Sequence, residues 1–274
     1  IGALILLLPI FFIKKEYGLY ALLIVRPLVD LFSSYTIITY QSLALNLNAI
    51  IALLVILWFI SLILKERLTL ANLPGKWWLG GLIIWSALSS LISIDLFNTL
   101  SEFLRLLSLV IIFVVAYQVA KERPHALTRL VPVVAVAMTI PVALALFQLL
   151  TATGLSFGGL DNRVYGTFGH PNVLGFYLVI TLSLLLLNYR QSLLYPWLIA
   201  PGLLALLFTY TRGAYLGFAV IQIIMGLKYY RKYIFIGLGA ITGLILGWQL
   251  LNSVLISTFN YNLNDNDLLR RVTI

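Results

Sequence analysis

The sequence contains no cysteine, only two histidines and few charged side chains. Without cysteine, the chain cannot use thiol catalysis, iron–sulfur clusters or cysteine-based zinc sites. Charged residues make up 10% of its 274 residues, whereas soluble domains carry roughly 25%. Negatively charged residues are the less frequent, with nine Asp and Glu against 18 Lys and Arg. So few charges cannot cover a water-soluble body of this size, which excludes a soluble enzyme, a secreted disulfide scaffold and a disordered tail.

Apolar residues take the place of the missing charges: 62% of the chain is hydrophobic and the mean hydropathy is +1.04. A bilayer core about 30 Å thick needs about 20 apolar residues in a helix. The sequence therefore predicts an all-α, polytopic transmembrane bundle of about ten helices. The expected segments are 1–13, 17–35, 42–64, 77–93, 103–120, 129–150, 172–189, 193–210, 214–227 and 233–251.

The chain begins at Ile1 inside an apolar run and shows no signal peptide with a basic start and a small-residue cleavage site. We therefore expect a fragment of a longer chain, organised in two regions. Residues 1–150 hold the N-terminal transmembrane helices. Residues 151–274 hold an outer loop (151–172), helices to about residue 251 and the start of a large outer loop.

The positive charges divide between alternate joints of these segments. One set has twelve residues and includes every lysine, and the other has six residues, all of them arginine. By the positive-inside rule the first set is cytoplasmic, so the second set faces the outer side. The first set is Lys14, Lys15, Lys65, Arg67, Lys76, Lys121, Arg123, Arg129, Arg190, Lys228, Arg231 and Lys232. The second set is Arg26, Arg105, Arg163, Arg212, Arg270 and Arg271.

Arg163 lies in the loop 151–172, which is rich in Gly and aromatic residues and has no amphipathic period, so we expect an irregular outer loop. The loop ends in His170-Pro171-Asn172, and Pro171 suits the first position of the next helix. That helix runs inward, so its N-terminal N–H groups form an anion site on the outer side. A guanidinium binds phosphate bidentately, which makes Arg163 a candidate phosphate ligand. The structural alternative for any of the six outer arginines is a position at lipid headgroups or an ion pair with a carboxylate, from Asp30, Asp95, Glu102 or Asp161.

Arg212 lies in TYTRGAYLG, which turns one helix into the next with almost no loop. The returning helix has about 14–17 residues before Lys228, or about 21–25 Å, which is short of the ~30 Å core. We therefore expect Arg212 below the outer interface, where an unpaired charge is costly and usually functional. Gly213 and Gly217 favour a tightly packed turn over an arm that snorkels into lipid headgroups. Arg163 and Arg212 together predict a pyrophosphate clamp.

Two motifs then carry a family resemblance. The stretch RVYGTFGHPNVLGFYL is followed about 35 residues later by LLFTYTRGAYLGF. This pair resembles the Wzy_C domain of the bacterial O-antigen ligase and polymerase family, whose pattern is an Arg, G-x-F-x-(N)PN-x-x-(G/A), a helix and an (S/T)RG turn. The RP-x-x-D at Arg26 to Asp30 is similar to the family's early outer loop. The resemblance covers about residues 17–274, with its specific part in 163–217, and His170 stands where the family commonly has Asn.

The resemblance implies a membrane glycosyltransferase of the GT-C type, multi-pass in the bacterial plasma (inner) membrane and active on its outer side. The donor would be a glycan on a polyprenyl pyrophosphate, and the acceptor a lipid A–core sugar, another glycan or a protein hydroxyl. It leaves ligase and polymerase both open. At the matching positions, Arg163, Arg212 and Asn172 would bind the pyrophosphate. The family's base is a His in a large loop after the (S/T)RG turn, which this chain enters at about Asn252 without a further His; His170 is the local candidate base.

Other polar groups on the outer side have two readings. Arg26 with Asp30, and Glu102 with Arg105, are candidates either for substrate contact or for structural ion pairs.

Metal and nucleic acid are not expected as partners. Asp265 and Asp267 have the DxD form of many metal–nucleotide sites, but a lipid donor needs no nucleotide. No dinucleotide fingerprint or phosphate-binding loop is present, so we expect no metal and no other cofactor.

The competing class is a small-anion carrier of the bicarbonate type, because some proteins with the resembling domain are described as inorganic-carbon transporters. A carrier should show charged or broken helices at mid-membrane. In this sequence the intramembrane charge is expected only in the outer half, which favours an enzyme. A flippase or assembly partner without catalysis is a third reading.

Overall fold

The fold is given by a computed structural model. It describes residues 13–32, 36–40, 43–65, 73–94, 96–122, 124–157 and 160–229, together with 231, 235–236, 239 and 242. Within these residues the chain is all-α, with eight α-helices and two small hairpins. The helices are α2 (Lys15–Val29), α3 (Leu47–Leu64), α4 (Lys76–Leu91), α5 (Leu96–Glu122), α6 (Pro124–Thr151), α7 (Pro171–Leu187), α8 (Leu194–Phe208) and α9 (Arg212–Lys228).

Two of these helices are long and apolar enough to cross a membrane. The qualifying stretches are Glu102–Glu122 in α5 and Thr128–Thr151 in α6. At 1.5 Å per residue their 21 and 24 residues exceed the ~30 Å hydrocarbon core. The eight helices coincide with eight of the ten expected segments. The expected helices at 1–13 and 233–251 lie almost entirely outside the described residues.

Two expected helix boundaries differ in the structure, one because a 3₁₀ turn ends the helix early and the other because a hairpin precedes it. The expected segment 17–35 ends earlier, since α2 stops at Val29 and a 3₁₀ turn, Asp30–Phe32, follows. The segment expected to begin at residue 42 becomes helical only at Leu47, because β1 (Thr36–Tyr40) and β2 (Leu43–Asn46) form an antiparallel hairpin before it. Apolar composition alone does not separate a buried helix end from a short strand.

The loop expected to be irregular also contains a hairpin. β3 (Leu155–Phe157) pairs antiparallel with β4 (Leu160–Arg163), and Leu155 lies opposite Arg163. The pairing satisfies backbone N–H and C=O groups between the two strands. Its consequence for the site is that Arg163 ends a strand of defined register.

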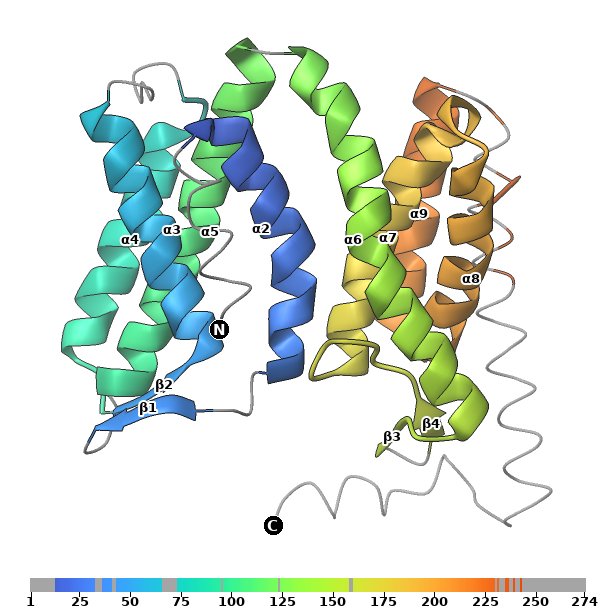
Figure 1. The fold of residues 1–274 in the computed structure, drawn as a ribbon, viewed down its shortest axis with the longest axis horizontal. Helices are drawn as coiled ribbons and strands as arrows, with labels where there is room; N and C mark the ends of the chain where they lie inside the picture. The colour runs from blue at the N-terminus through green and yellow to red at the C-terminus, as the bar shows by residue number, and fades with distance from the viewer. Residues whose placement is uncertain are drawn as a thin grey trace.

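Buried side chains form two clusters, which define two halves of the molecule. The α6–α9 half packs around Met138, Leu178 and Leu182, all 0% exposed. The α2–α5 half packs around Val115 and Trp58, which are also fully buried. Helix α2 contacts α6 and joins the halves. In Figure 1, α2 to α5 lie on the left and α6 to α9 on the right.

Both hairpins lie at the same, lower end of the helices in Figure 1. Arg26 is in the last turn of α2 and Arg212 is the first residue of α9, so both belong to that end. Lys15 begins α2 and Lys228 ends α9, so they belong to the opposite end. Arg26 and Arg212, from the smaller charge set, therefore share one end of the bundle, and Lys15 and Lys228 belong to the opposite end.

Candidate functional site

Arg163 is a buried cation where three parts of the chain meet. Its side chain leaves the end of β4, and the residue is 7% exposed. Its Nε donates to the carbonyl oxygen of Thr209 at 3.0 Å, and its Nη2 donates to Oδ1 of Asn172 at 3.0 Å. The backbone N–H of Val164 donates to the carbonyl of Phe208 at 3.0 Å. The guanidinium is therefore fixed against both the start of α7 and the end of α8.

Asn172 joins Arg163 to the turn before α9. Its Oδ1 accepts from Arg163 and also from the Thr211 hydroxyl at 3.1 Å. Thr211 is the residue before α9. One amide oxygen thus connects β4, α7 and the α8–α9 turn (209–211), and places Arg163 beside the turn that carries Arg212.

The electrostatics of Arg163 favour an anionic ligand. Burial lowers the pKa of its guanidinium, but arginine stays protonated in proteins. Its two polar partners, Asn172 and Thr209, are both neutral. In the described part of the chain no carboxylate lies within ion-pair distance of Arg163, and Nη1 has no acceptor. A buried charge without a counter-ion is costly, so the site is suited to bind one.

His170 is the N-cap of α7, and Pro171 is the first helical residue, as the sequence predicts. The cap bond runs from the backbone N–H of Asn172 to Nδ1 of His170 at 3.1 Å. A neutral imidazole whose Nδ1 accepts carries its proton on Nε2. The cap bond thus occupies Nδ1. His170 lies next to the site, but its geometry is that of a structural cap.

Arg212 is the first residue of α9 and is exposed on the surface of the protein. Its position below the outer membrane interface stays a prediction. The preceding residue, Thr211, is buried, and its hydroxyl donates to Oδ1 of Asn172.

The closest glycine packing near the turn before α9 is at Gly175, whereas Gly213 and Gly217, which the sequence associates with a tightly packed turn, have more room. A Cβ at Gly175 would lie 3.0 Å from that of Ala214 and 3.2 Å from that of Thr211. A Cβ at Gly213 would make ordinary contact at 3.5 Å, and one at Gly217 would meet nothing within 4 Å. The turn before α9 is tightly packed, but against α7 at Gly175.

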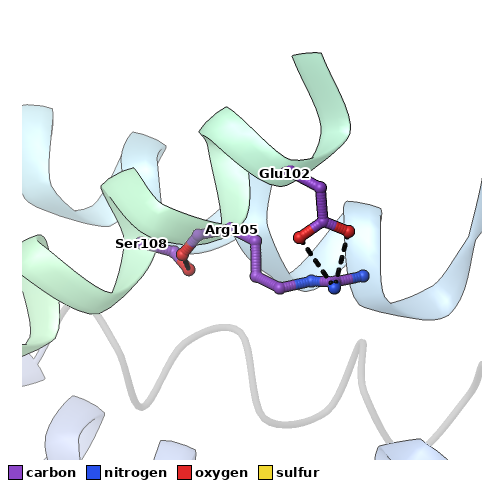
Figure 2. Close-up of polar contacts among 3 residues, drawn as sticks. All are labelled: Glu102, Arg105 and Ser108. Atoms are coloured by element: carbon purple, nitrogen blue, oxygen red, sulfur yellow. Dashed lines mark hydrogen bonds and ion pairs between the residues drawn. The ribbon is translucent and has the colours of Figure 1, made fainter. Parts of the chain in front are cut away.

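Arg105 and Arg26 each have a carboxylate partner. Figure 2 shows Arg105 Nη1 donating to both oxygens of Glu102, at 2.8 and 3.0 Å, on the exposed face of α5. Arg26 pairs with Asp30 at 3.4 Å. Both pairs belong to the α2–α5 half and neither touches the Arg163 network. This geometry favours the ion-pair reading over substrate contact.

Three polar residues of the site are not identified by the sequence. Thr209 contributes a backbone carbonyl, and Thr211 and Gln148 contribute side chains. The threonines lie within the TYTRG motif, so that motif is the signal that points to them. Gln148 lies in an apolar run of α6 and has no such signal.

The second histidine of the chain, His125, is exposed near the start of α6, at the end opposite Gln148. Asp265 and Asp267, the residues of the DxD form, lie outside the described residues.

Comparison with known proteins adds no family. No family model matches the chain, and neither a curated protein nor a solved structure matches it.

Proposed function

We propose that the protein is a membrane glycosyltransferase of the O-antigen ligase and polymerase kind, which transfers a glycan from a polyprenyl pyrophosphate to a lipid, glycan or protein acceptor. The proposal includes about ten spans of the bacterial plasma membrane, with residues 151–274 carrying the site on the outer side. It rests on the paired motifs RVYGTFGHPN and TYTRG and on the contacts that join them.

A membrane environment is supported by the apolar surface as well as by α5 and α6. In α4 the only buried residue is Ser90. Trp77, Trp78 and Trp85 of that helix are all at least 75% exposed. Water would penalise so much exposed apolar area, whereas lipid would not.

The single observation that carries the function is the buried Arg163 without a carboxylate among the described residues. Its Asn172 link aligns it with the turn that leads into Arg212. A pyrophosphate has the charge and the paired oxygens that a guanidinium binds with two parallel hydrogen bonds. The N–H groups at the starts of α7 and α9 supply further positive potential at the same end.

In the proposed reaction an acceptor hydroxyl attacks the anomeric carbon of the donor sugar. The new carbon–oxygen bond forms as the bond to the pyrophosphate oxygen breaks, and the electron pair leaves with the pyrophosphate. Arg163 and Arg212 stabilise the charge that develops there. A general base takes the hydroxyl proton. The family resemblance assigns that base to a histidine in the large loop after the (S/T)RG turn, where this sequence has none up to Ile274, while His170 acts as the cap of α7.

The test is a transfer assay with the full protein in liposomes, a glycan on polyprenyl pyrophosphate and a sugar acceptor. Arg163→Lys should lower the rate by on the order of 10²–10³, because a lysine cannot reproduce the two-bond fork. Arg105→Lys is the matched control and should keep most activity. If liposomes containing the wild type take up bicarbonate but transfer no glycan, the carrier alternative replaces this proposal.

A further inference from the structure

Gln148, in the last turn of α6, makes a three-bond contact with the segment that follows Arg163. Its Oε1 accepts from the backbone N–H groups of Tyr165 at 2.9 Å and Gly166 at 2.8 Å. Its Nε2 donates to the carbonyl of Gly166 at 3.1 Å. Gln148 is only 8% exposed. The side chain therefore provides hydrogen-bond partners for three backbone groups that belong to no helix or strand.

The same segment is held by direct backbone packing on α6. Gly166 has φ +59°, and a Cβ there would lie 2.6 Å from the carbonyl oxygen of Pro141. On the other side, Val164 N–H bonds to Phe208 at the end of α8. Residues 163–166 are thus clamped between α6 and the end of α8.

We propose that Gln148 is a positioning residue that holds Arg163 in its ligand-facing pose. The Arg163 side chain reaches Thr209 and Asn172 from the end of β4. The backbone just after it, at Tyr165 and Gly166, is held by three hydrogen bonds to Gln148. The ligand part of this inference rests on the proposed function, since Arg163 is taken to hold a pyrophosphate. The positioning part rests on the hydrogen bonds alone.

The first measurement reads the Arg163 side chain directly. In the purified full protein with ¹⁵N-labelled arginine, the buried Nε–H of Arg163 should exchange slowly with water, because it is bonded to Thr209. Gln148→Met keeps the length of the side chain and removes all three hydrogen bonds. We expect this variant to raise Nε–H exchange at least about tenfold, because buried backbone groups lose their partner.

The matched control is Gln222→Met. Gln222 is 0% exposed in the same half, and its Nε2 donates to Ser183 at 3.0 Å, away from the loop. This control should leave Arg163 exchange unchanged. An unchanged signal in Gln148→Met overturns the proposal. An equal rise in both variants overturns it too, since the effect would then be general loosening.

The second measurement titrates inorganic pyrophosphate into the wild type, Gln148→Met, Arg163→Lys and the double variant. We expect Gln148→Met to weaken binding about tenfold when Arg163 is present and to have no further effect beside Arg163→Lys. Additive losses overturn the proposal, because a residue acting through Arg163 cannot act without it. If Arg163→Lys binds pyrophosphate as the wild type does, the proposed function fails, and the exchange measurement alone decides whether Gln148 positions Arg163.

Discussion

Arg163 donates from Nη2 to Oδ1 of Asn172 at 3.0 Å, and the same oxygen accepts from Thr211. An amide oxygen can accept two hydrogen bonds without carrying charge. Asn172 therefore fixes the guanidinium and leaves its positive charge uncompensated. A carboxylate at this position would fix it equally well but neutralise it.

This difference leads to the first prediction. Asn172→Asp should preserve the fold and lower pyrophosphate affinity at least tenfold, because the new carboxylate becomes the counter-ion of Arg163. Titration with inorganic pyrophosphate measures the effect. Asn188→Asp, at the other end of α7, is the control and should bind normally. Affinity unchanged in Asn172→Asp would mean that Arg163 does not contact the ligand.

The two arginines should act together on one leaving group. Arg212→Lys is expected to lower transfer by on the order of 10²–10³, as Arg163→Lys does. The transfer rate of the double variant should fall much less than the product of the two single losses. If both arginines hold one leaving group, either single substitution already removes the stabilisation that needs both. Rates from equal amounts of membrane-inserted protein test this. Strictly multiplicative losses would indicate two independent sites.

The sequence identifies Arg163 and Arg212 because a charge in an apolar chain stands out. It does not identify Gln148, whose partners are 17 and 18 residues away and are backbone groups. It singles out Gly213 and Gly217 and does not identify Gly175, which makes the closer contact. A helical glycine looks the same in sequence whether its face meets a neighbouring helix or lipid. The helix positions are predicted approximately, because each helix is a largely apolar run of the chain, although among the described helices only α5 and α6 contain a stretch long enough to span a membrane. The two short hairpins are not predicted, because a few apolar residues do not distinguish a strand from a helix end or a loop.

Gly175 gives a prediction about packing. Gly175→Val should destabilise the protein by about 1–3 kcal/mol, because the Cβ positions of Ala214 and Thr211 leave no room for a larger side chain. Gly217→Ala should leave stability equal or slightly higher, because its Cβ meets nothing and alanine favours the helix. Thermal unfolding of both variants in the same detergent compares them. Equal midpoints would show that α7 and α9 do not approach closely at Gly175.

The orientation in the membrane can be tested separately, because the chain has no native cysteine. Ser156→Cys, on the exposed face of β3, should react with an impermeant maleimide added to intact cells. Arg190→Cys, between α7 and α8, should react only after the cells are opened. The reverse pattern would place the Arg163 site on the cytoplasmic side and remove the basis for a reaction on the outer face.

The last prediction separates the two roles of His170. As the N-cap of α7, its Nδ1 accepts from the N–H of Asn172, and asparagine is among the best residues for that position. His170→Asn should therefore keep both thermal stability and transfer rate, whereas His170→Ala should lose about 0.5–2 kcal/mol of stability through the missing cap. A general base behaves differently, because neither substitution can take a proton at neutral pH and both would lose about 10²–10⁴ in rate. Transfer rates of His170→Asn at wild-type protein levels decide the matter: a loss of that size would make His170 the base, and a normal rate leaves it the cap that holds Asn172 beside Arg163.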